Sequence, residues 1–387
     1  MAVNEETPEN TPFIDLPAAL VEEMLAEAGQ VAEALFATFR DLRAERRRLR
    51  ETLAQHDLLL HESTLGYPPL PTTCGVDGSY AIERLLSVDL AACAAVAVEG
   101  LTPPSEKRHW EQPHHRLFVR SEIHDVDTAT VLRAVMVGYE LLLAVKAPHD
   151  VVMLDGTLTL PVIYFNQALS KASDTPELRS SQEFLARAIE FMEAYREILR
   201  PNRWDKCYVG LPKYTTRREI GRRLGWPENQ DDRGLLTFLL EAGELTKPLP
   251  LEQPRQAWHL ATGMLEAELR VPLEELARQV AAALQRIRVL YYKPHQWLPA
   301  LRLEIPATVA DNYSSLGLII QAIKYQCATP GMLEPYPLYL ADRTVKALAR
   351  ALPAFRQVAT QQIAEHYEGD IAEVFFGMHG YRSESGV

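Results

Sequence analysis

The sequence predicts a mixed α/β fold in which helices flank a sheet. Apolar residues recur at helical spacing over residues 15–60 and 127–147, whereas 115–125 alternates apolar and polar residues and 150–160 begins with a continuous apolar run. The first two patterns are typical of helices, and the last two of half-buried and central strands. With 387 residues, 47% of them hydrophobic and 24% charged, the chain is long enough to bury a large core around such a sheet.

The first predicted element is a long N-terminal helix. Its apolar positions lie three, four or seven residues apart and are Leu20, Met24, Val31, Leu35, Phe39, Leu42, Leu49 and Leu53. This spacing predicts one helix over 15–60, in which Gly29 is the candidate break. We therefore expect a disordered tail over 1–13 and a helical arm over 14–66, which "YPPLP" (67–71) ends.

A strand-rich block follows the arm. It consists of "TTCGVDG" (72–78), an apolar stretch at 80–100, the strand at 115–125, the helix at 127–147 and the apolar strand at 150–160. The predicted order is therefore strand, strand, strand, helix, strand. One aspartate lies on the first strand and another ends the fourth, and a glycine follows each of them.

The C-terminal half adds helices and three further strands. Its predicted elements are a helical stretch at 161–200, a strand at 204–214, helices at 216–245 and 262–290, two strands within 288–307, and two final helices that contain "SSLGLIIQAIKYQCAT" and "YPLYLADRTVKALARALPAF". We expect one domain over 67–375 with a helical insertion over about 216–290, and a C-terminal tail over 376–387.

The charge of the chain restricts its partners. A net charge of -12 is unusual for a nucleic-acid binder, which normally carries a basic patch. The cations here are clustered in "RDLRAERRRLR" (40–50) and "TTRREIGRRL" (215–224). Both runs are also explained as solvated helix faces, since Glu45 and Glu51 interleave the first. Binding to DNA would need these clusters, metal ions at the contact, or a partner protein.

Cysteine usage and hydropathy favour a cytoplasmic protein. The four cysteines have no paired spacing, which argues against both disulfides and a zinc site. The acidic, polar N-terminus lacks the features of a secretory signal. Since no stretch approaches the ~18 uninterrupted apolar residues of a membrane span, we expect no membrane association.

Three acidic residues fall where this order of elements would bring them together. Asp77 lies on the first strand, Glu140 on an otherwise apolar face of the helix at 127–147, and Asp155 at the end of the fourth strand. A buried acid needs a partner, and Mg²⁺ or Mn²⁺ bound by carboxylates is one such partner. Two such ions about 4 Å apart can promote phosphodiester hydrolysis. The alternatives are that Asp77 and Gly78 form a hairpin turn, that Glu140 extends to solvent, and that Asp155 caps a turn.

Other chemistry has little support in the motifs. Lys213 ends the strand at 204–214, where it would either contact a phosphate or be an ordinary surface lysine. The chain has no P-loop, no G-x-S-x-G and no G-x-G-x-x-G, so Walker-type nucleotide binding and a serine triad are not indicated.

Four motifs in order over roughly residues 70–350 resemble the NurA nuclease family. They are "VDGSYAIERL", "LDGTLTLP", "VGLPKYT" and "EPYPLYLADRTVKAL". The resemblance implies an RNase H-like fold and Mn²⁺-dependent cleavage of DNA, with 5′-to-3′ exonuclease and single-strand endonuclease activities. It also implies a homodimer and partnership with HerA, a hexameric DNA-translocating ATPase.

The resemblance assigns roles to four carboxylates and one lysine. These are Asp77, Glu140, Asp155 and Asp342 as metal ligands and catalytic residues, with Lys213 as a further catalytic residue. Glu122 is the alternative to Glu140, whose spacing to the second Asp-Gly is short for the family. Asp342 stands where the family often has histidine, a conservative change for a metal site because RNase H-like enzymes commonly use a carboxylate there.

The resulting hypothesis is that the protein is a deoxyribonuclease that uses two Mn²⁺ or Mg²⁺ ions. It would process DNA ends together with a HerA-type motor, in DNA repair or antiviral defence. We expect the N-terminal helix and the stretch over 216–290 to carry the dimer, DNA and HerA contacts. One alternative is a non-catalytic RNase H-like structural partner of an ATPase ring. Another is a sugar-kinase or actin-like ATPase, although "DGSY" and "DGTL" have too few glycines for its phosphate loops.

Overall fold

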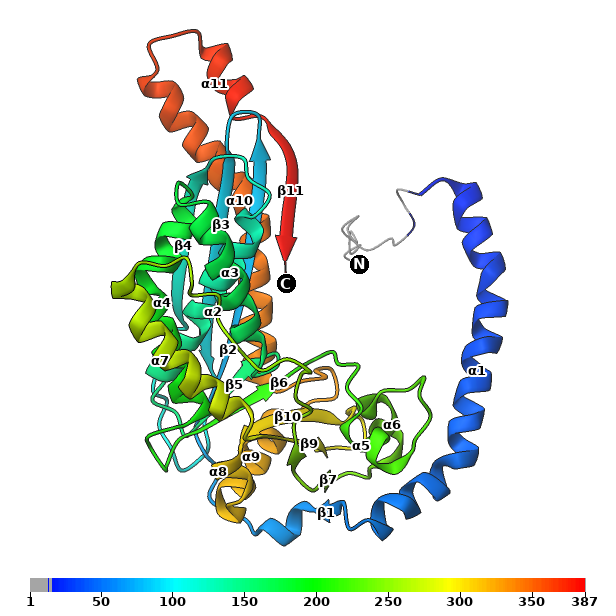
Figure 1. The fold of residues 1–387 in the computed structure, drawn as a ribbon. Coiled ribbons are helices and arrows are strands. Elements are labelled where there is room, and N and C mark those ends of the chain that lie inside the picture. The colour runs from blue at the N-terminus through cyan, green and yellow to red at the C-terminus, as the bar shows by residue number, and fades with distance from the viewer. Residues whose placement is uncertain (1–12, 14–15, 387) are drawn as a thin grey trace. The chain divides into compact units, whose positions relative to one another are not determined.

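The computed structural model describes residue 13 and residues 16–386 (Figure 1). Apart from Phe13, the predicted tail over 1–13 lies outside the described residues. The chain divides into two compact units, residues 1–56 and 57–387. Residues 57–66, expected in the N-terminal arm, belong to the second unit because strand β1 (Leu59–His61) pairs with a strand of its sheet.

The first unit consists of one described helix, α1 (Ala18–Gln55). The long helix predicted from the apolar spacing is present, and it continues through Gly29 without a break. A run of its apolar side chains is exposed, namely Leu20, Met24, Leu25, Val31, Leu35 and Phe36. In the cationic run, Arg47 pairs with Glu51 at 2.8 Å, as expected for interleaved charges on a solvated helix face.

The second unit is built on one mixed sheet. Its other strands are β2 (Thr73–Leu85), β3 (Asp89–Glu99), β4 (His114–Glu122), β5 (Val151–Asp155), β6 (Cys207–Leu211), β7 (Glu244–Thr246), β8 (Leu249–Pro250), β9 (Ile287–Lys293), β10 (Leu301–Pro306) and β11 (Gly380–Gly386). The order is β1-β7-β9-β10-β6-β5-β2-β3-β4, with β11 paired to β2 and β8 to β9. Strand β5 is parallel to both of its neighbours, and the other pairings are antiparallel.

Helices cover both faces of this sheet (Figure 1). They are η2 (Glu62–Leu65), α2 (Thr128–Lys146), α3 (Leu160–Asp174), α4 (Arg179–Leu199), α5 (Glu219–Leu224), α6 (Asp232–Leu239), α7 (Ala267–Leu284), α8 (Ala307–Ala310), α9 (Tyr313–Gln326), α10 (Tyr336–His366) and α11 (Ile371–Gly377). Successive residues of β5 point to opposite faces. Val152 and Leu154 join the core under α2, α3, α4 and α7, whereas Val151 and Met153 pack with α9.

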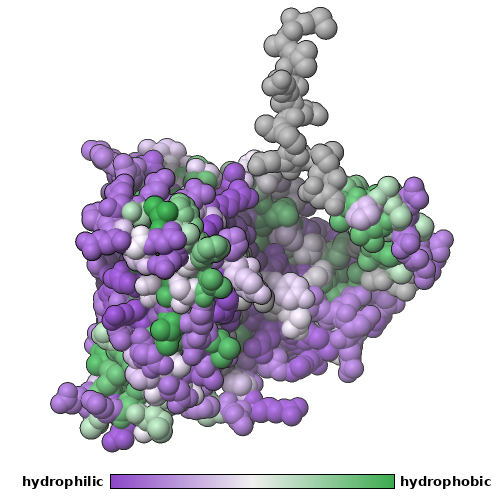
Figure 2. Space-filling view, turned by 90° about the horizontal axis from the view of Figure 1, so that it is seen from above, coloured by the Kyte–Doolittle hydropathy of each residue, from purple (hydrophilic) through white to green (hydrophobic). Residues whose placement is uncertain are grey.

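Burial explains the apolar composition of α2. By length and composition alone this helix is apolar enough to cross a membrane, but 78% of its apolar window is buried inside the fold. Hydrophilic residues cover most of the visible face of the second unit, and hydrophobic residues form separate patches there (Figure 2).

Two predicted regions differ from the structure. The stretch 216–290 contains α5, α6 and α7, but it also contributes β7, β8 and the start of β9 to the sheet, so it is not a purely helical insertion. The stretch 376–387, expected to be a tail, contains β11, which pairs antiparallel with β2. Its "GYRSESG" segment has few apolar residues, so the sequence pattern alone did not indicate a strand.

Candidate metal centre

The end of β5 brings two aspartates together. The parallel pairing of β2 with β5 ends at Val76 and Leu154, so that Asp77 and Asp155 are the next residues on adjacent strands. Asp77 is buried and Asp155 is half-buried. The sequence produces this arrangement through two apolar strands, each of which carries one acid at the same height in the sheet.

A third carboxylate comes from α10. This helix begins after Pro335, and its start can approach β2 closely because residue 75 is glycine: a Cβ there would lie 2.6 Å from the backbone nitrogen of Leu338. The approach places Asp342 so that one carboxylate oxygen from each of Asp77, Asp155 and Asp342 lies within 4.8 Å of the others. Three carboxylates at this spacing form a site for a hard divalent cation.

Glu140 reaches the same place from α2. Its side chain is only 7% exposed, and burial, followed by the charges of Asp77 and Asp155, raises its pKa well above the ordinary value. Burial and the charge of Asp155 likewise raise the pKa of Asp77 to about 8. The site thus gathers acids that repel one another, which is the environment that a bound cation would stabilise.

Gly78 has a different role from the predicted one. The interpretation of Asp77-Gly78 as a turn is wrong, because both residues lie inside the continuous strand β2, whose hairpin to β3 lies after Leu85. A Cβ at position 78 would lie 2.7 Å from Cγ of Met136 and closer still to Oε1 of Glu140. The glycine therefore leaves the space that the Glu140 carboxylate occupies.

We expect Gly78→Ala to weaken Mn²⁺ binding by roughly 10- to 100-fold, because the added methyl must displace Glu140. Overpacking should also cost about 1–3 kcal/mol of stability. Isothermal titration with Mn²⁺ and thermal unfolding measure the two effects. Gly100→Ala is the matched control, since a Cβ there would lie 2.7 Å from Oε1 of Gln326, outside the carboxylate cluster. Unchanged Mn²⁺ affinity in Gly78→Ala would contradict the role given to Glu140.

Lys213 lies among the acids. It follows β6, and its Nζ is 2.8 Å from Asp155 Oδ2, 3.0 Å from Asp342 Oδ1 and 3.2 Å from Glu334 Oε2. Although burial opposes the charged form, the ion pair with Asp155 and the hydrogen bonds to both aspartates raise the pKa of Lys213 above its ordinary value. The lysine is therefore a fixed positive charge beside the three aspartates.

The acids open into a hollow of about 350 Å³. Its lining also includes Tyr80, Arg133 and Tyr164. Arg133 donates a hydrogen bond of 2.9 Å to the hydroxyl of Tyr80, and its guanidinium lies 5.2 Å from the centre of the Tyr164 ring. An arginine between two aromatic rings beside a carboxylate cluster suits an anionic ligand that carries aromatic groups.

The structure brings together Asp77, Glu140, Asp155, Lys213 and Asp342, all five of the predicted site residues. Glu122 is not in the site. It accepts hydrogen bonds from the backbone nitrogens of Arg179 (2.7 Å) and Ser180 (2.6 Å), and so caps the start of α4.

Sequence reasoning missed Glu334, Arg133, Tyr80 and Tyr164. The sequence positions of two of these residues could have indicated a place in the site. Glu334 directly precedes the "PYPL" turn of the motif that carries Asp342, and Arg133 lies seven residues before Glu140, on the same side of α2. Tyr80 and Tyr164 left no such signal beyond lying near the two Asp-Gly pairs.

Known proteins resemble this chain in sequence and in fold. The NurA domain family model matches residues 71–347. The crystal structure of the NurA nuclease from Sulfolobus solfataricus has a TM-score of 0.57 at 14% identity, with 91% of this chain and 99% of that chain covered. A crystal structure of NurA with manganese has a TM-score of 0.54 at 12% identity, with 89% and 99% covered. No curated protein sequence matches significantly. The predicted fold class, a mixed sheet flanked by helices, is confirmed.

Proposed function

The chain belongs to the NurA family, and from this premise we propose that it is a divalent-metal-dependent nuclease that hydrolyses phosphodiester bonds in DNA. The observation that carries the proposal is the convergence of Asp77, Asp155 and Asp342 within 4.8 Å, with Glu140 and Lys213 beside them. Similar structures include one described as a nuclease and one solved with manganese, which supports the same activity and Mn²⁺ as the metal.

Each side chain has a role that follows from its place. Asp77, Asp155 and Asp342 would hold Mn²⁺ or Mg²⁺ through carboxylate oxygens, and Glu140 would complete the set; we propose two ions. When bound, the metal supplies an activated water and stabilises the charge of the departing oxygen. Lys213 carries a positive charge among these acids, and with the aspartates bound to metal its ammonium group would be free to hold a non-bridging phosphate oxygen. Arg133 offers a second positive charge for the neighbouring phosphate.

Incubation of the purified protein with end-labelled single- and double-stranded DNA tests the proposal. We expect cleavage with Mn²⁺ and none with EDTA, and labels at the 5′ or 3′ end would reveal whether the polarity is the proposed 5′-to-3′ direction. DNA binding without cleavage under every metal condition, also with the ATPase partner present, would overturn the nuclease proposal and favour a non-catalytic structural partner.

The proposed partners are DNA, a HerA-type hexameric ATPase and a second copy of the chain, acting in DNA-end processing for repair or antiviral defence. The exposed apolar side chains of α1, among them Leu25 and Phe36, support a protein contact by this helix. The four cysteines are all buried and free, which supports a reducing, cytoplasmic setting. Light scattering of the protein alone tests for the dimer, and light scattering of its mixture with the ATPase tests for that complex.

Most arginines of the run at 215–224 have partners within the second unit. Arg218 donates to the backbone oxygens of Trp226, Pro227 and Gln230, and both Arg217 and Arg222 contact Glu252. These contacts engage three of the run's four arginines, and Arg217 and Arg222 share one acidic partner at the surface. A DNA contact on the expected stretch 216–290 is better supported by a set of cations without acidic partners.

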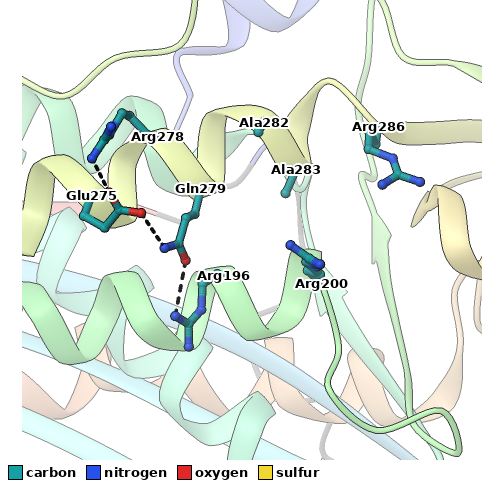
Figure 3. Close-up of a pocket in the computed structure, with 8 residues that line it drawn as sticks. All are labelled: Arg196, Arg200, Glu275, Arg278, Gln279, Ala282, Ala283 and Arg286. Atoms are coloured by element: carbon teal, nitrogen blue, oxygen red, sulfur yellow. Dashed lines mark hydrogen bonds and ion pairs between the residues drawn. The ribbon is translucent and has the colours of Figure 1, made fainter.

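A hollow of about 320 Å³ between α4 and α7 offers such a set (Figure 3). Arg196 donates to Gln279, and Arg278 pairs with Glu275. The side chains of Arg200 and Arg286 have no hydrogen-bond or ion-pair partner among the described residues, and Figure 3 shows both at the same end of the hollow. In a chain with a net charge of -12, two unpaired arginines at one place suit consecutive phosphates of a DNA strand.

We expect Arg200→Gln with Arg286→Gln to lower the slope of log affinity for DNA against log salt by up to about 2, since each phosphate contact contributes roughly 0.7–0.9. Fluorescence anisotropy in EDTA measures binding without cleavage. The control is Arg217→Gln with Arg222→Gln, which removes the same charge from residues held by Glu252. Equal slopes for the two double variants would exclude a DNA contact at the hollow.

A further inference from the structure

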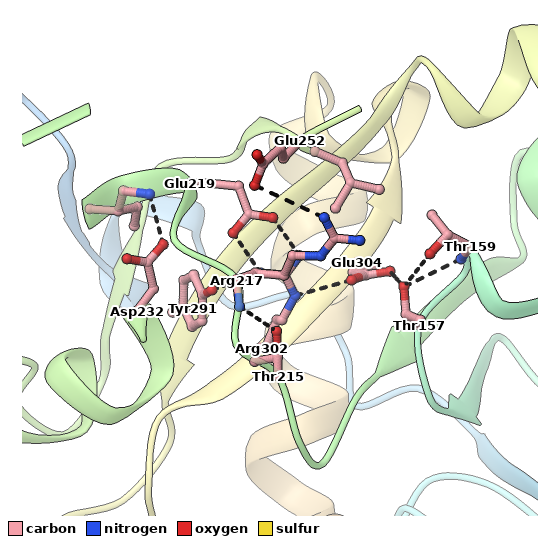
Figure 4. Close-up of polar contacts among 12 residues, drawn as sticks. Thr157, Thr159, Thr215, Arg217, Glu219, Asp232, Glu252, Tyr291, Arg302 and Glu304 are labelled. Carbon is pink, nitrogen blue, oxygen red and sulfur yellow. Dashed lines mark hydrogen bonds and ion pairs between the residues drawn. The ribbon is translucent and has the colours of Figure 1, made fainter. Parts of the chain in front are cut away.

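A buried chain of polar contacts connects the turn after Asp155 to α5 (Figure 4). The turn begins at Gly156, whose φ of +106° favours glycine, and leads into α3. The turn packs closely over β6. Residue 210 of that strand is glycine, and a Cβ there would lie 2.9 Å from the carbonyl oxygen of Gly156. The turn thereby reaches Glu304 of β10, which is the residue opposite Gly210.

One oxygen of Glu304 holds this turn. Oε2 accepts a hydrogen bond of 2.6 Å from the hydroxyl of Thr157 and another of 2.9 Å from the backbone nitrogen of Leu158. Thr157 in turn lies 3.0 Å from the hydroxyl of Thr159, at the start of α3. These contacts fix both sides of the turn directly after Asp155.

The other oxygen of Glu304 is held by Arg302. Its Nε donates to Oε1 of Glu304 at 3.0 Å, and its two terminal nitrogens donate to Glu219 of α5 at 2.8 and 2.7 Å. Arg302 also donates to the hydroxyl of Tyr291 at 2.7 Å. The side chains of Glu219, Arg302 and Glu304 are 4%, 0% and 2% exposed, so water does not compete for these bonds.

Stability alone does not account for this arrangement. A buried ion pair commonly contributes no more than well-packed apolar residues would, since the desolvation of its charges offsets their attraction. Here two carboxylates share one guanidinium, which leaves a formal charge of -1 buried near the acidic site. Such a group is better explained by the geometry that it enforces on its neighbours.

We infer that Glu304, oriented by Arg302 and Glu219, is a positioning residue that holds the Gly156–Thr159 turn and thereby the direction of the Asp155 carboxylate toward the metal. The inference rests on the proposed function, because it assigns Asp155 to a metal. It adds to the proposed site residues that act on the turn beside a metal ligand. Partners that orient the ligands of a metal commonly contribute 10- to 100-fold to its affinity.

Glu304→Gln tests the inference. A glutamine offers only one oxygen, whereas the present carboxylate accepts the donors of the turn on one side and Arg302 on the other. We expect the Mn²⁺ dissociation constant, measured by calorimetry without DNA, to rise by about 10-fold or more. In metal-free protein, amide hydrogen exchange in the peptide over 156–160 should become faster.

Glu62→Gln is the matched control. Glu62 is also a buried carboxylate. It accepts a hydrogen bond from the hydroxyl of Tyr292 and forms an ion pair with Lys324, but it does not contact the turn after Asp155. We expect this variant to lose stability without a change in Mn²⁺ affinity or in exchange over 156–160. Glu219→Gln, one contact further from the turn, should shift both readouts in the same direction as Glu304→Gln but by less.

The outcomes are distinct. Wild-type Mn²⁺ affinity and wild-type exchange over 156–160 in folded Glu304→Gln would overturn the positioning role. Equally fast amide exchange over 156–160 in Glu62→Gln would also overturn the positioning role, because the faster exchange would then reflect a general loss of stability. If the wild-type protein bound no Mn²⁺ at all, the proposed function would fail, while hydrogen exchange in the metal-free protein would still decide whether Glu304 holds the turn.

Discussion

Replacing Asp77 or Asp155 with alanine is expected to abolish Mn²⁺-dependent DNA cleavage, by at least about 1000-fold, while the melting temperature stays near that of the wild type. The loss of activity follows from the geometry. One carboxylate oxygen from each of Asp77, Asp155 and Asp342 lies within 4.8 Å of the others, so removal of either Asp77 or Asp155 leaves an incomplete set of ligands.

The retained stability follows from electrostatics. Burial, and then repulsion by Asp155, raise the pKa of Asp77 to about 8, so the charged form of this residue is disfavoured in the folded metal-free protein at neutral pH. Burial also raises the pKa of Asp155, although Lys213 opposes the shift. Burying two carboxyl groups that would ionise in the unfolded chain costs folding free energy at neutral pH, and removing either side chain removes part of that cost, which offsets the packing lost. Circular dichroism melts in EDTA measure the effect.

Asp150 provides the control for this prediction. It directly precedes β5, at the end opposite Asp155, and accepts hydrogen bonds of 2.8 Å from both the backbone nitrogen and the hydroxyl of Thr72. Asp150→Ala should therefore lose stability and keep cleavage, the reverse of the two active-site variants. Cleavage at wild-type rates by both Asp77→Ala and Asp155→Ala would refute the assignment of the site.

Local sequence patterns were enough to predict the main strands and the acids that they carry. Asp155 ends an apolar run, "VVML", that reads as a buried central strand, and the structure has β5 there. Glu140 stands out because it is a lone acid on the apolar helix α2. In both cases the signal is an acid at a position where its neighbours require burial, and such a residue needs a partner.

Contacts between distant segments were not predictable in the same way. Gly78 has the local pattern of a turn residue, yet its role depends on Glu140, which lies 62 residues away and packs against it. Glu304 and Arg302 are two apart on a strand that is buried on both faces, which is a signal of a polar network, but their partner Glu219 is on another element. Periodicity shows that such residues are buried, whereas it does not identify what they contact.

The lysine among the acids carries the second large prediction. In Lys213→Met the metal-free protein should melt at a lower temperature than the wild type, because Asp155, Asp342 and Glu334 lose the cation that lies 2.8 to 3.2 Å from their oxygens. Mn²⁺ supplies positive charge to the same carboxylates, so it should raise the melting temperature of the variant by more than that of the wild type. Cleavage should fall about 100-fold, since a fixed charge beside the phosphate is lost.

Lys324→Met separates this effect from the general loss of an ion pair. Lys324 is 36% exposed, against 37% for Lys213, and pairs with the buried Glu62 outside the carboxylate cluster. Its removal should lower the melting temperature in EDTA, but the shift produced by Mn²⁺ should equal that of the wild type, and cleavage should be retained. A Mn²⁺ shift in Lys213→Met no larger than in Lys324→Met would mean that the lysine and the metal do not act on the same carboxylates, and that Lys213 belongs to the scaffold rather than to the catalytic site.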